Sequence, residues 1–227
     1  MYRNRLTIMY CLKIKVFDRK VLLLFLQKNQ MKKIFLFSCF MLFAAGFANA
    51  QRIKKLEGDP KPLAGETKLN VEFTYNNMSV GKFDKEADYI ASKKADYNKK
   101  EAGKGDTWEQ SWIGDRKGRY EPNFTDLFEK NTPFALGKYP EAKYTLIINT
   151  SRTEPGYNIY ITKKNAEIDL EIDIVETATR KSIAKYSVKN APGRTFGGND
   201  YDTGLRIEES YAAAGKHFGK ELKGDIK

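Results

Sequence analysis

A strict alternation of apolar and acidic residues at 167–174 is the feature that most constrains the fold. A period of two places one set on each face of a β-strand, so one face is buried and the other is solvated. After the polar segment Thr177–Lys181 the alternation resumes over residues 183–189, and the two stretches together predict a β-hairpin. The buried face of such a sheet must be covered by a second layer. The alternating residues are Ile168, Leu170, Ile172 and Ile174 against Glu167, Asp169, Glu171 and Asp173.

Helices predicted elsewhere in the chain can form that second layer. Helical spacing of apolar residues predicts that helices cover one face of the sheet. In the last helix Gly215 and Gly219 predict a close approach to the sheet. The order β-α-α-β-β-β-α predicts an α+β fold of two layers, with a mixed or antiparallel sheet of about four strands. The further predicted strands are 69–75 and 144–150, and the predicted helices are 84–100, 106 to near Gly118, 122–128 and 207–222.

Residues 31–50 have the pattern of a signal peptide. Met31-Lys32-Lys33 opens a positive region, an apolar run follows, and Ala48-Asn49-Ala50 is a small-x-small cleavage site with Gln51 as the first mature residue. We interpret residues 1–30 as an upstream extension, the alternative being a long positive region of the same leader. We exclude lipidation because Cys39 lies inside the apolar run rather than after it.

The charge and cysteine content of the mature protein limit its partners and its chemistry. Of the 40 basic and 29 acidic residues, nine and one lie in residues 1–50, which leaves 31 and 28 in residues 51–227. A net charge of +3 in the body gives no argument for nucleic-acid binding. Both cysteines, Cys11 and Cys39, fall in the leader, so we expect a cysteine-free, periplasmic or secreted protein without a membrane span. We interpret residues 51–67 as a flexible arm and residues 68–223 as a single globular domain.

Familiar catalytic motifs do not occur in the chain. It has no Gly-x-Ser-x-Gly elbow, no His-Glu-x-x-His and no phosphate-binding Gly-Lys-Ser/Thr, and His217 is its single histidine. The glycine-rich loop Gly193–Gly204 is interpreted as a helix start capped by Asp202 or Thr203. These observations favour a protein that is not an enzyme, and we predict no catalytic residues and no cofactor.

The most distinctive cluster lies in the predicted helix that begins at Asp106. Steps of four, three and four residues place Trp108, Trp112, Asp115 and Arg119 on one helical face, with Arg116 and Tyr120 beside it. Aromatic and arginine side chains dominate binding surfaces, so this face is a candidate for stacking a sugar or docking a peptide. The alternative is that both tryptophans pack on the sheet while the Asp115–Arg119 pair closes its edge.

A second candidate is the acidic ladder of the alternating strand. Asp169, Glu171 and Asp173 share one strand face, where carboxylates can bind a hard cation such as Ca²⁺ or act as general acid and base. The alternative is a solvated face of cross-strand ion pairs with Lys185 and Lys189.

Several segments resemble a known group of proteins. They are Met78-Ser79-Val80-Gly81, TWEQSWIGDRKGRYEPNF, TEPGYNI and PGRTFGGNDYDTGLRIEESYAAAGKHFGKEL. Over residues 68–223 the chain resembles a family of small secreted Bacteroidota proteins whose motifs imply no activity. Its element order is similar, more distantly, to TolB N-terminal-like envelope accessory domains, although it lacks the lipidated cysteine of such lipoproteins.

Together these observations lead us to expect a non-catalytic exported envelope protein that acts as a binding or assembly accessory. Its expected partner is an envelope protein or a glycan, and not nucleic acid. The alternatives are a carboxylate-based hydrolase acting on envelope glycans, or a Ca²⁺-dependent binding module.

Overall fold

The computed structural model describes residues 51–158, 162–193 and 202–227. The described residues belong to one compact unit, Ala50–Lys227. The predicted signal peptide, the upstream extension, both cysteines and most of the glycine-rich loop lie outside the described residues. Within those residues, no helix has the length and apolar character needed to cross a membrane.

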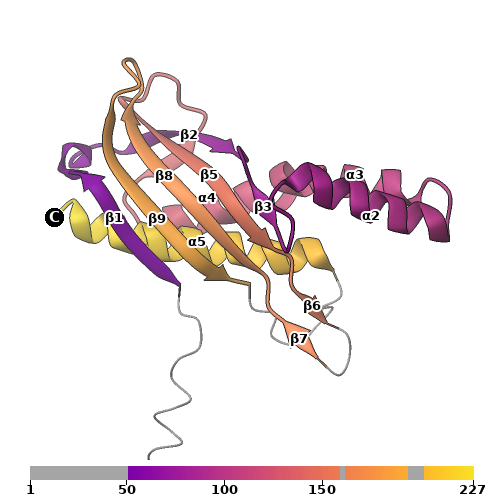
Figure 1. Ribbon diagram of the computed structural model, residues 1–227. Coiled ribbons are helices and arrows are strands. Elements are labelled where there is room, and N and C mark those ends of the chain that lie inside the picture. Colours follow the sequence, from indigo (N-terminus) through magenta and orange to yellow (C-terminus); the bar gives the residue numbers. More distant parts are fainter. Residues whose placement is uncertain (1–50, 159–161, 194–201) are drawn as a thin grey trace, which may run out of the picture. The chain divides into compact units, whose positions relative to one another are not determined.

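A seven-stranded mixed sheet forms the body of the described region (Figure 1). The strand order is β1-β9-β8-β5-β2-β4, and β3 pairs with β5. Pairing is antiparallel among β1, β9, β8 and β5, whereas β2 and β3 run parallel to β5, and β4 runs parallel to β2. The strands are β1 (Arg52–Gly58), β2 (Lys68–Thr74), β3 (Ser79–Val80), β4 (Ala135–Gly137), β5 (Tyr144–Glu154), β8 (Glu167–Glu176) and β9 (Ser182–Pro192), with a separate pair β6 (Tyr157–Asn158) and β7 (Lys163–Lys164).

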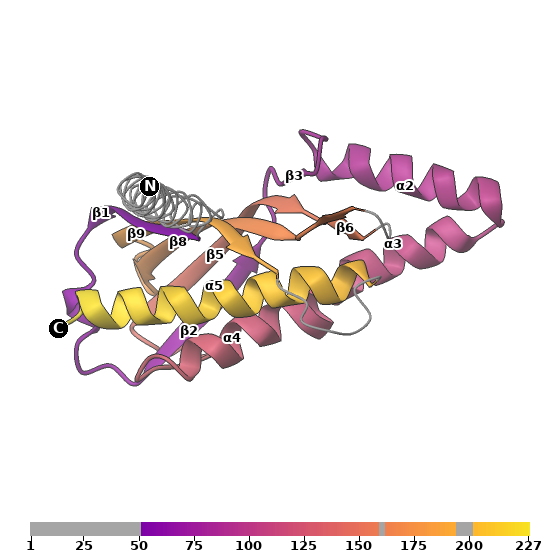
Figure 2. The ribbon, with the colours of Figure 1, turned by 90° about the horizontal axis from the view of Figure 1, so that it is seen from below.

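The helices fall into two groups. Helices α4 (Glu121–Glu129) and α5 (Thr203–Asp225) lie side by side along one face of the sheet (Figure 2). Helices α2 (Glu86–Lys100) and α3 (Lys104–Asp115) form a hairpin that projects beyond the sheet (Figure 1). A π-helical turn, η2 (Arg116–Tyr120), joins α3 to α4, and a short 3-10 turn, η1 (Lys61–Leu63), follows β1.

The predicted α+β fold, with about four strands and all helices on one face, is wrong: the described residues form a seven-stranded sheet and a second two-stranded sheet, and α2 and α3 project beyond the sheet instead of covering it. The largest departure is β1, which lies in the predicted arm and pairs with β9 from Arg52↔Lys189 to Gly58↔Ala184. In this edge strand only the Ile53 side chain is partly buried, so its sequence shows no alternation of apolar and polar residues. The strand forms because its backbone pairs with β9. The short strands β3 and β4 likewise lack a period long enough to detect.

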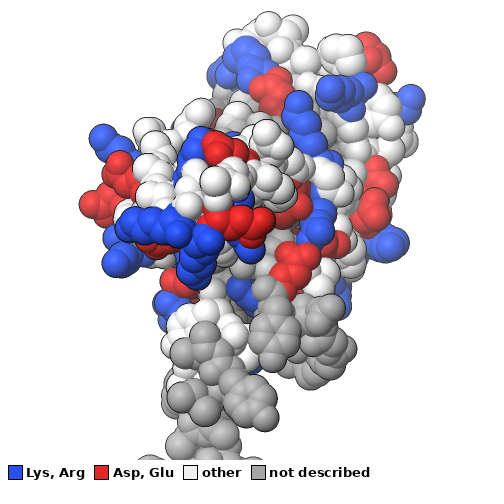
Figure 3. Space-filling view, turned by 90° about the vertical axis from the view of Figure 1, so that its right-hand side faces the viewer, with Lys and Arg blue, Asp and Glu red and all other residues white. Residues whose placement is uncertain are grey.

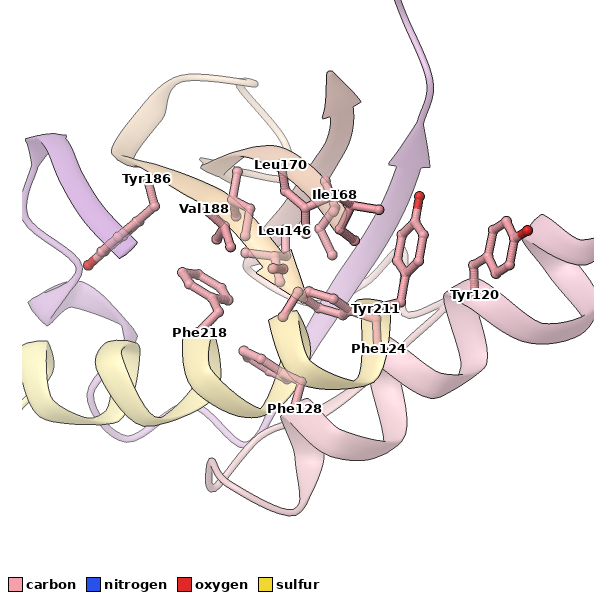
Figure 4. Packing of buried hydrophobic residues seen from close by; sticks show 14 of the residues in the cluster. Tyr120, Phe124, Phe128, Leu146, Ile168, Leu170, Tyr186, Val188, Tyr211 and Phe218 are labelled. Atoms are coloured by element: carbon pink, nitrogen blue, oxygen red, sulfur yellow. The ribbon is translucent and has the colours of Figure 1, made fainter. Parts of the chain in front are cut away.

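The alternating strand and its hairpin are confirmed. Strand β8 pairs with β9 from Glu167↔Pro192 to Val175↔Ser182. Its four alternating apolar residues are at most 2% exposed. They meet aromatic side chains from both covering helices, as Figure 4 shows. The labelled residues of this core are Phe124 and Phe128 of α4, Tyr211 and Phe218 of α5, Leu146 of β5, Ile168 and Leu170 of β8, and Tyr186 and Val188 of β9, with Tyr120 at its edge.

Helix α5 begins as predicted but packs differently. The Asp202 carboxylate accepts hydrogen bonds from the backbone N–H groups of Gly204 and Leu205, at 2.8 and 3.3 Å, so the predicted cap is confirmed. Gly215 and Gly219 face α4 rather than the sheet. A Cβ at Gly215 would lie 2.2 Å from the Phe124 carbonyl oxygen. The glycines therefore set the spacing of the two helices.

Candidate functional site

Aromatic rings hold α2 and α3 together within the projecting hairpin. Tyr89 of α2 meets Trp108 and Trp112 of α3, with ring centroids 5.8 and 5.1 Å apart. The two indoles stack on each other at 5.7 Å. Trp112 is buried, and its Nε1–H donates to Glu86 Oε1 at 2.6 Å. Trp112 is therefore part of the hairpin's internal packing, whereas Trp108 remains partly exposed.

Arg116, at the base of the hairpin, contacts Tyr75, which directly follows β2. Its guanidinium donates to the same Glu86 oxygen that Trp112 uses, and it lies 4.1 Å from the centre of the Tyr75 ring. The Tyr75 hydroxyl donates in turn to Glu121 Oε1 at 3.3 Å. Burial, followed by the nearby Tyr211 and Glu121, raises the pKa of Tyr75 above its usual value. This arrangement orients the hairpin relative to the sheet and leaves Arg116 little freedom to meet a ligand.

Arg119 of η2 links Asp115, at the end of α3, to Asp202, at the start of α5. Arg119 Nε lies 3.2 Å from Asp115 Oδ1, and Arg119 Nη1 donates to Asp202 Oδ2 at 2.8 Å. Burial raises the pKa of Asp115; Arg119 opposes this shift and Asp202 adds to it. Burial acts to raise the pKa of Asp202 too, but the Arg119 and backbone hydrogen bonds outweigh it and the pKa is lowered. The predicted i,i+4 pair thus exists and continues to a third residue.

The six residues of the predicted binding face do not share one surface. Tyr120 is 4% exposed and stacks on Tyr211 in the core, whereas Trp108 packs within the projecting hairpin against Tyr89 and Trp112. Tyr120 is the last residue of η2, whose π-helical turn has more residues per turn than an α-helix and so changes the direction of the side chains that follow Asp115. The predicted end of this helix near Gly118 is close to the observed end of α3 at Asp115, and the π-helical turn η2 carries the chain from there into α4.

Trp108 borders a groove that the sequence did not reveal. The groove, with a volume of about 630 Å³, runs beside the end of the hairpin where α2 turns into α3. Tyr97 and Trp108 contribute aromatic rings whose centroids lie 5.9 Å apart. The hydroxyls of Thr107 and Ser111 lie on the α3 side. At the turn Lys104 Nζ lies 3.1 Å from Glu101 Oε2, so the charges in the groove are paired with each other.

The hairpin side of the molecule carries no surface of a single charge. Seen from the side on which the hairpin projects, Lys and Arg alternate with Asp and Glu over the visible surface (Figure 3). Lys94 of α2, for example, pairs at 2.8 Å with both Asp106 and Glu109 of α3. These hydrogen bonds raise the pKa of Lys94, Asp106 contributing most. Such a mixed surface gives no long-range attraction to a polyanion.

Sequence reasoning missed Tyr97 and Glu86. Both lie on α2, where a helix over residues 84–100 was predicted but no site residue was. The sequence did contain a signal for their position, namely a glycine, Gly103, between the two helices. Gly103 adopts φ 83° and turns the chain. Because Tyr97 and Trp108 lie at similar distances on either side of it, they meet in the antiparallel helical hairpin.

The three carboxylates of the acidic ladder do not converge. Asp169 Oδ1 accepts from Arg152 at 3.0 Å and from the Asn190 backbone at 2.8 Å, while Lys189 lies 3.4 Å from its other oxygen. Asp173 accepts from the Ser182 hydroxyl at 2.5 Å, and Glu171 is exposed. Among the described residues no three His, Cys, Asp or Glu side chains are grouped to hold a metal ion. The predicted pairing with Lys189 is present, whereas Lys185 pairs with Glu57 of β1 at 2.5 Å.

No protein-family model and no curated protein sequence matches the chain. Among solved structures it is similar to the PelC dodecamer from Paraburkholderia phytofirmans, at 8% identity and a TM-score of 0.37, covering 77% of this chain and 98% of that one. A point variant of the same dodecamer, solved in another space group, gives 9% identity and a TM-score of 0.34, covering 72% of this chain and 97% of that one.

Proposed function

We propose that this protein is a non-catalytic, exported accessory of the cell envelope that binds a neutral glycan in the groove beside Trp108. The signal-peptide pattern at residues 31–50, with a cleavage site before Gln51, supports export. The observation that carries the binding role is the groove itself, which combines two aromatic rings with two hydroxyl groups on a projecting hairpin.

The chemistry of the groove favours a sugar over other ligands. A pyranose presents apolar C–H groups that pack on aromatic surface and hydroxyls that exchange hydrogen bonds with protein polar groups. Tyr97 and Trp108 supply the first kind of surface. The hydroxyls of Thr107 and Ser111 donate to the backbone carbonyls of Gly103 and Thr107, at 3.2 and 3.1 Å, and can accept hydrogen bonds from sugar hydroxyls. Because Lys104 and Glu101 neutralise each other, a charged ligand has no unbalanced partner there.

The hairpin is also preorganised for binding. Trp108 is held by Trp112 and Tyr89, and Trp112 is held in turn by Glu86. A surface whose side chains are already ordered loses less conformational entropy when a ligand binds.

Tryptophan fluorescence tests this proposal directly, because both tryptophans of the chain lie in α3. The protein, purified after export with its own leader, is screened on an array of bacterial envelope glycans, and the ligands found are titrated by emission. Trp108→Ala is expected to weaken binding by about tenfold or more, since truncating an aromatic anchor costs on the order of 1–2 kcal/mol.

Two further variants keep the test decisive. Ser111→Arg fills the groove from an exposed position without touching the aromatic packing and is expected to abolish binding. Ile113→Ala removes a side chain that is 43% exposed on the same helix, outside the groove, and is expected to leave binding unchanged. Folded Trp108→Ala and Ser111→Arg proteins with full affinity, or no glycan bound by the unmodified protein, would refute the proposal.

A further inference from the structure

Strand β1 forms one edge of the large sheet, with β9 on its inner side (Figure 1). In the described part of the chain no strand pairs with its outer side. The strand at the opposite edge, β4, is three residues long, whereas Arg52–Lys55 of β1 pair with β9 in an unbroken register. In such a strand every second residue directs its N–H and C=O groups away from the neighbouring strand, where a further strand can bind them.

The charged side chains of β1 lie on both faces of the sheet. Lys55 lies on the face that α5 covers, where its Nζ is 3.4 Å from Asp225 Oδ2. Because successive side chains of a strand alternate, Arg52 and Lys54 lie on the opposite face. Both are exposed, and neither forms an ion pair with another residue that the structure describes. The free edge of the sheet therefore carries two positive charges that are available to a partner.

The spacing of Arg52 and Lys54 defines the chemistry of that partner. Side chains two residues apart on a strand are about 7 Å apart, so acidic residues at alternate positions of an added strand have the same spacing. They would lie beside Arg52 and Lys54 as cross-strand pairs of opposite charge. A second copy of β1 is a poorer partner, because it brings positive side chains against positive ones.

Leu56 adds an apolar contact at the end of this edge. The register with β9 shifts between Lys55 and Glu57, so Leu56 has no partner on β9, and its side chain is 54% exposed. Glu57 does not compete for Arg52 or Lys54, because Lys185 holds its carboxylate at 2.5 Å. An added segment with apolar residues between its acidic ones can cover Leu56 and still pair with the charged residues.

We propose that β1 binds an extended segment of another protein, with alternating acidic and apolar side chains, as an additional strand of the sheet. Backbone hydrogen bonds would supply affinity, and Arg52 and Lys54 would supply selectivity. An anionic lipid surface would satisfy the two charges but leave the outward N–H and C=O groups of β1 unpaired. This edge shares no residue with the groove beside Trp108, so the inference does not depend on glycan binding.

A fluorescein-labelled peptide of alternating Glu and Val, blocked at both ends, is the probe for this edge. It is titrated by fluorescence anisotropy into the protein purified after export. The alternating peptide is expected to bind about tenfold more tightly than a peptide of the same composition with its glutamates in one block, and added salt is expected to weaken it. Amide hydrogen exchange in the complex is expected to slow in β1 and to stay unchanged in α2 and α3.

Two matched variants test the role of the charges. Lys54→Glu is expected to weaken binding of the alternating peptide by about tenfold, because attraction becomes repulsion. Lys117→Glu makes the same change of charge at an exposed position of η2 and is expected to leave binding unchanged. Circular dichroism checks that both variants are folded.

Several results would overturn the proposal. They are no binding of the alternating peptide, equal binding of the block peptide, full affinity in a folded Lys54→Glu protein, or unchanged exchange in β1 when the peptide is bound. Binding to phosphatidylglycerol vesicles without binding to the peptide would also overturn it, since the charges of β1 would then act on a lipid surface.

Discussion

The rings of Tyr120 and Tyr211 stack with centroids 5.1 Å apart and planes 5° from parallel, yet their hydroxyl groups lie in opposite environments. Tyr211 Oη shares a hydrogen bond of 2.6 Å with Thr150 Oγ1 in the core. Tyr120 Oη is buried and has no partner among the described residues. In Figure 4 the Tyr120 hydroxyl points away from the core cluster. One hydroxyl therefore stabilises the fold and the other does not.

This contrast predicts different effects for the same substitution. Tyr211→Phe is expected to lower the free energy of unfolding by about 1–2 kcal/mol, because it leaves the buried Thr150 hydroxyl without its partner. Tyr120→Phe is expected to be neutral or stabilising, because it removes a group that gains nothing from burial. Urea denaturation of the two variants measures both values, and equal losses would contradict the assignment.

The close contact of α5 with α4 predicts a strong position dependence for glycine replacement. Gly215→Ala is expected to lower the free energy of unfolding by about 1–3 kcal/mol, because its Cβ would lie 2.2 Å from the Phe124 carbonyl oxygen. Gly224→Ala, on the same helix with no atom within 4 Å of the added Cβ, is expected to be neutral or stabilising. Thermal denaturation followed by circular dichroism checks both, and a tolerated Gly215→Ala would disprove the spacing.

Glu86 is expected to control the stability of the α2–α3 hairpin. Glu86→Ala removes the acceptor shared by Trp112 Nε1 and Arg116, and is expected to cost about 3 kcal/mol, since both donors are then left partly buried without it. Amide hydrogen exchange in α2 and α3 reports the loss locally. Glu109→Ala, which breaks the more exposed pair with Lys94, is the control and is expected to cost at most about 1 kcal/mol.

Asp169 is expected to make the stability of the fold decrease at acidic pH. Burial acts to raise its pKa, but the Arg152 hydrogen bond, the Asn190 backbone N–H and the charges of Arg152 and Lys189 outweigh it and hold the pKa below the ordinary 3.8. A carboxyl whose pKa is lowered by folding stabilises the fold above its unfolded pKa, and this contribution is lost as the pH falls through the folded value.

Asp169→Asn is therefore expected to destabilise the protein by about 1–3 kcal/mol at neutral pH. The difference from wild type is expected to shrink as the pH falls below 3.8. Unfolding midpoints in urea over this range measure the effect. A difference independent of pH would show that the loss comes from geometry and not from the charge of Asp169.

Much of the fold was predictable wherever the pattern is local. The alternation in β8 and the stripe of α5 both specify a buried face within one element, and a buried face needs no knowledge of its partner. The cap at Asp202 was predictable for the same reason, since it depends on neighbouring residues only. The extent of the sheet was not predictable, because β1 is defined by its pairing with β9, more than half the chain away.

In the candidate site, too, local patterns were predictable from the sequence and long-range contacts were not. The sequence by itself determined that Trp108 and Trp112 occupy one helical stripe, since an α-helix repeats its contacts every three to four residues. Only the tertiary structure decided that Trp112 is buried against Glu86, that η2 turns Tyr120 into the core, and that Trp108 meets Tyr97 in a groove. Periodicity specifies which side chains share a face of one element, whereas a site also depends on which elements the folded chain brings together.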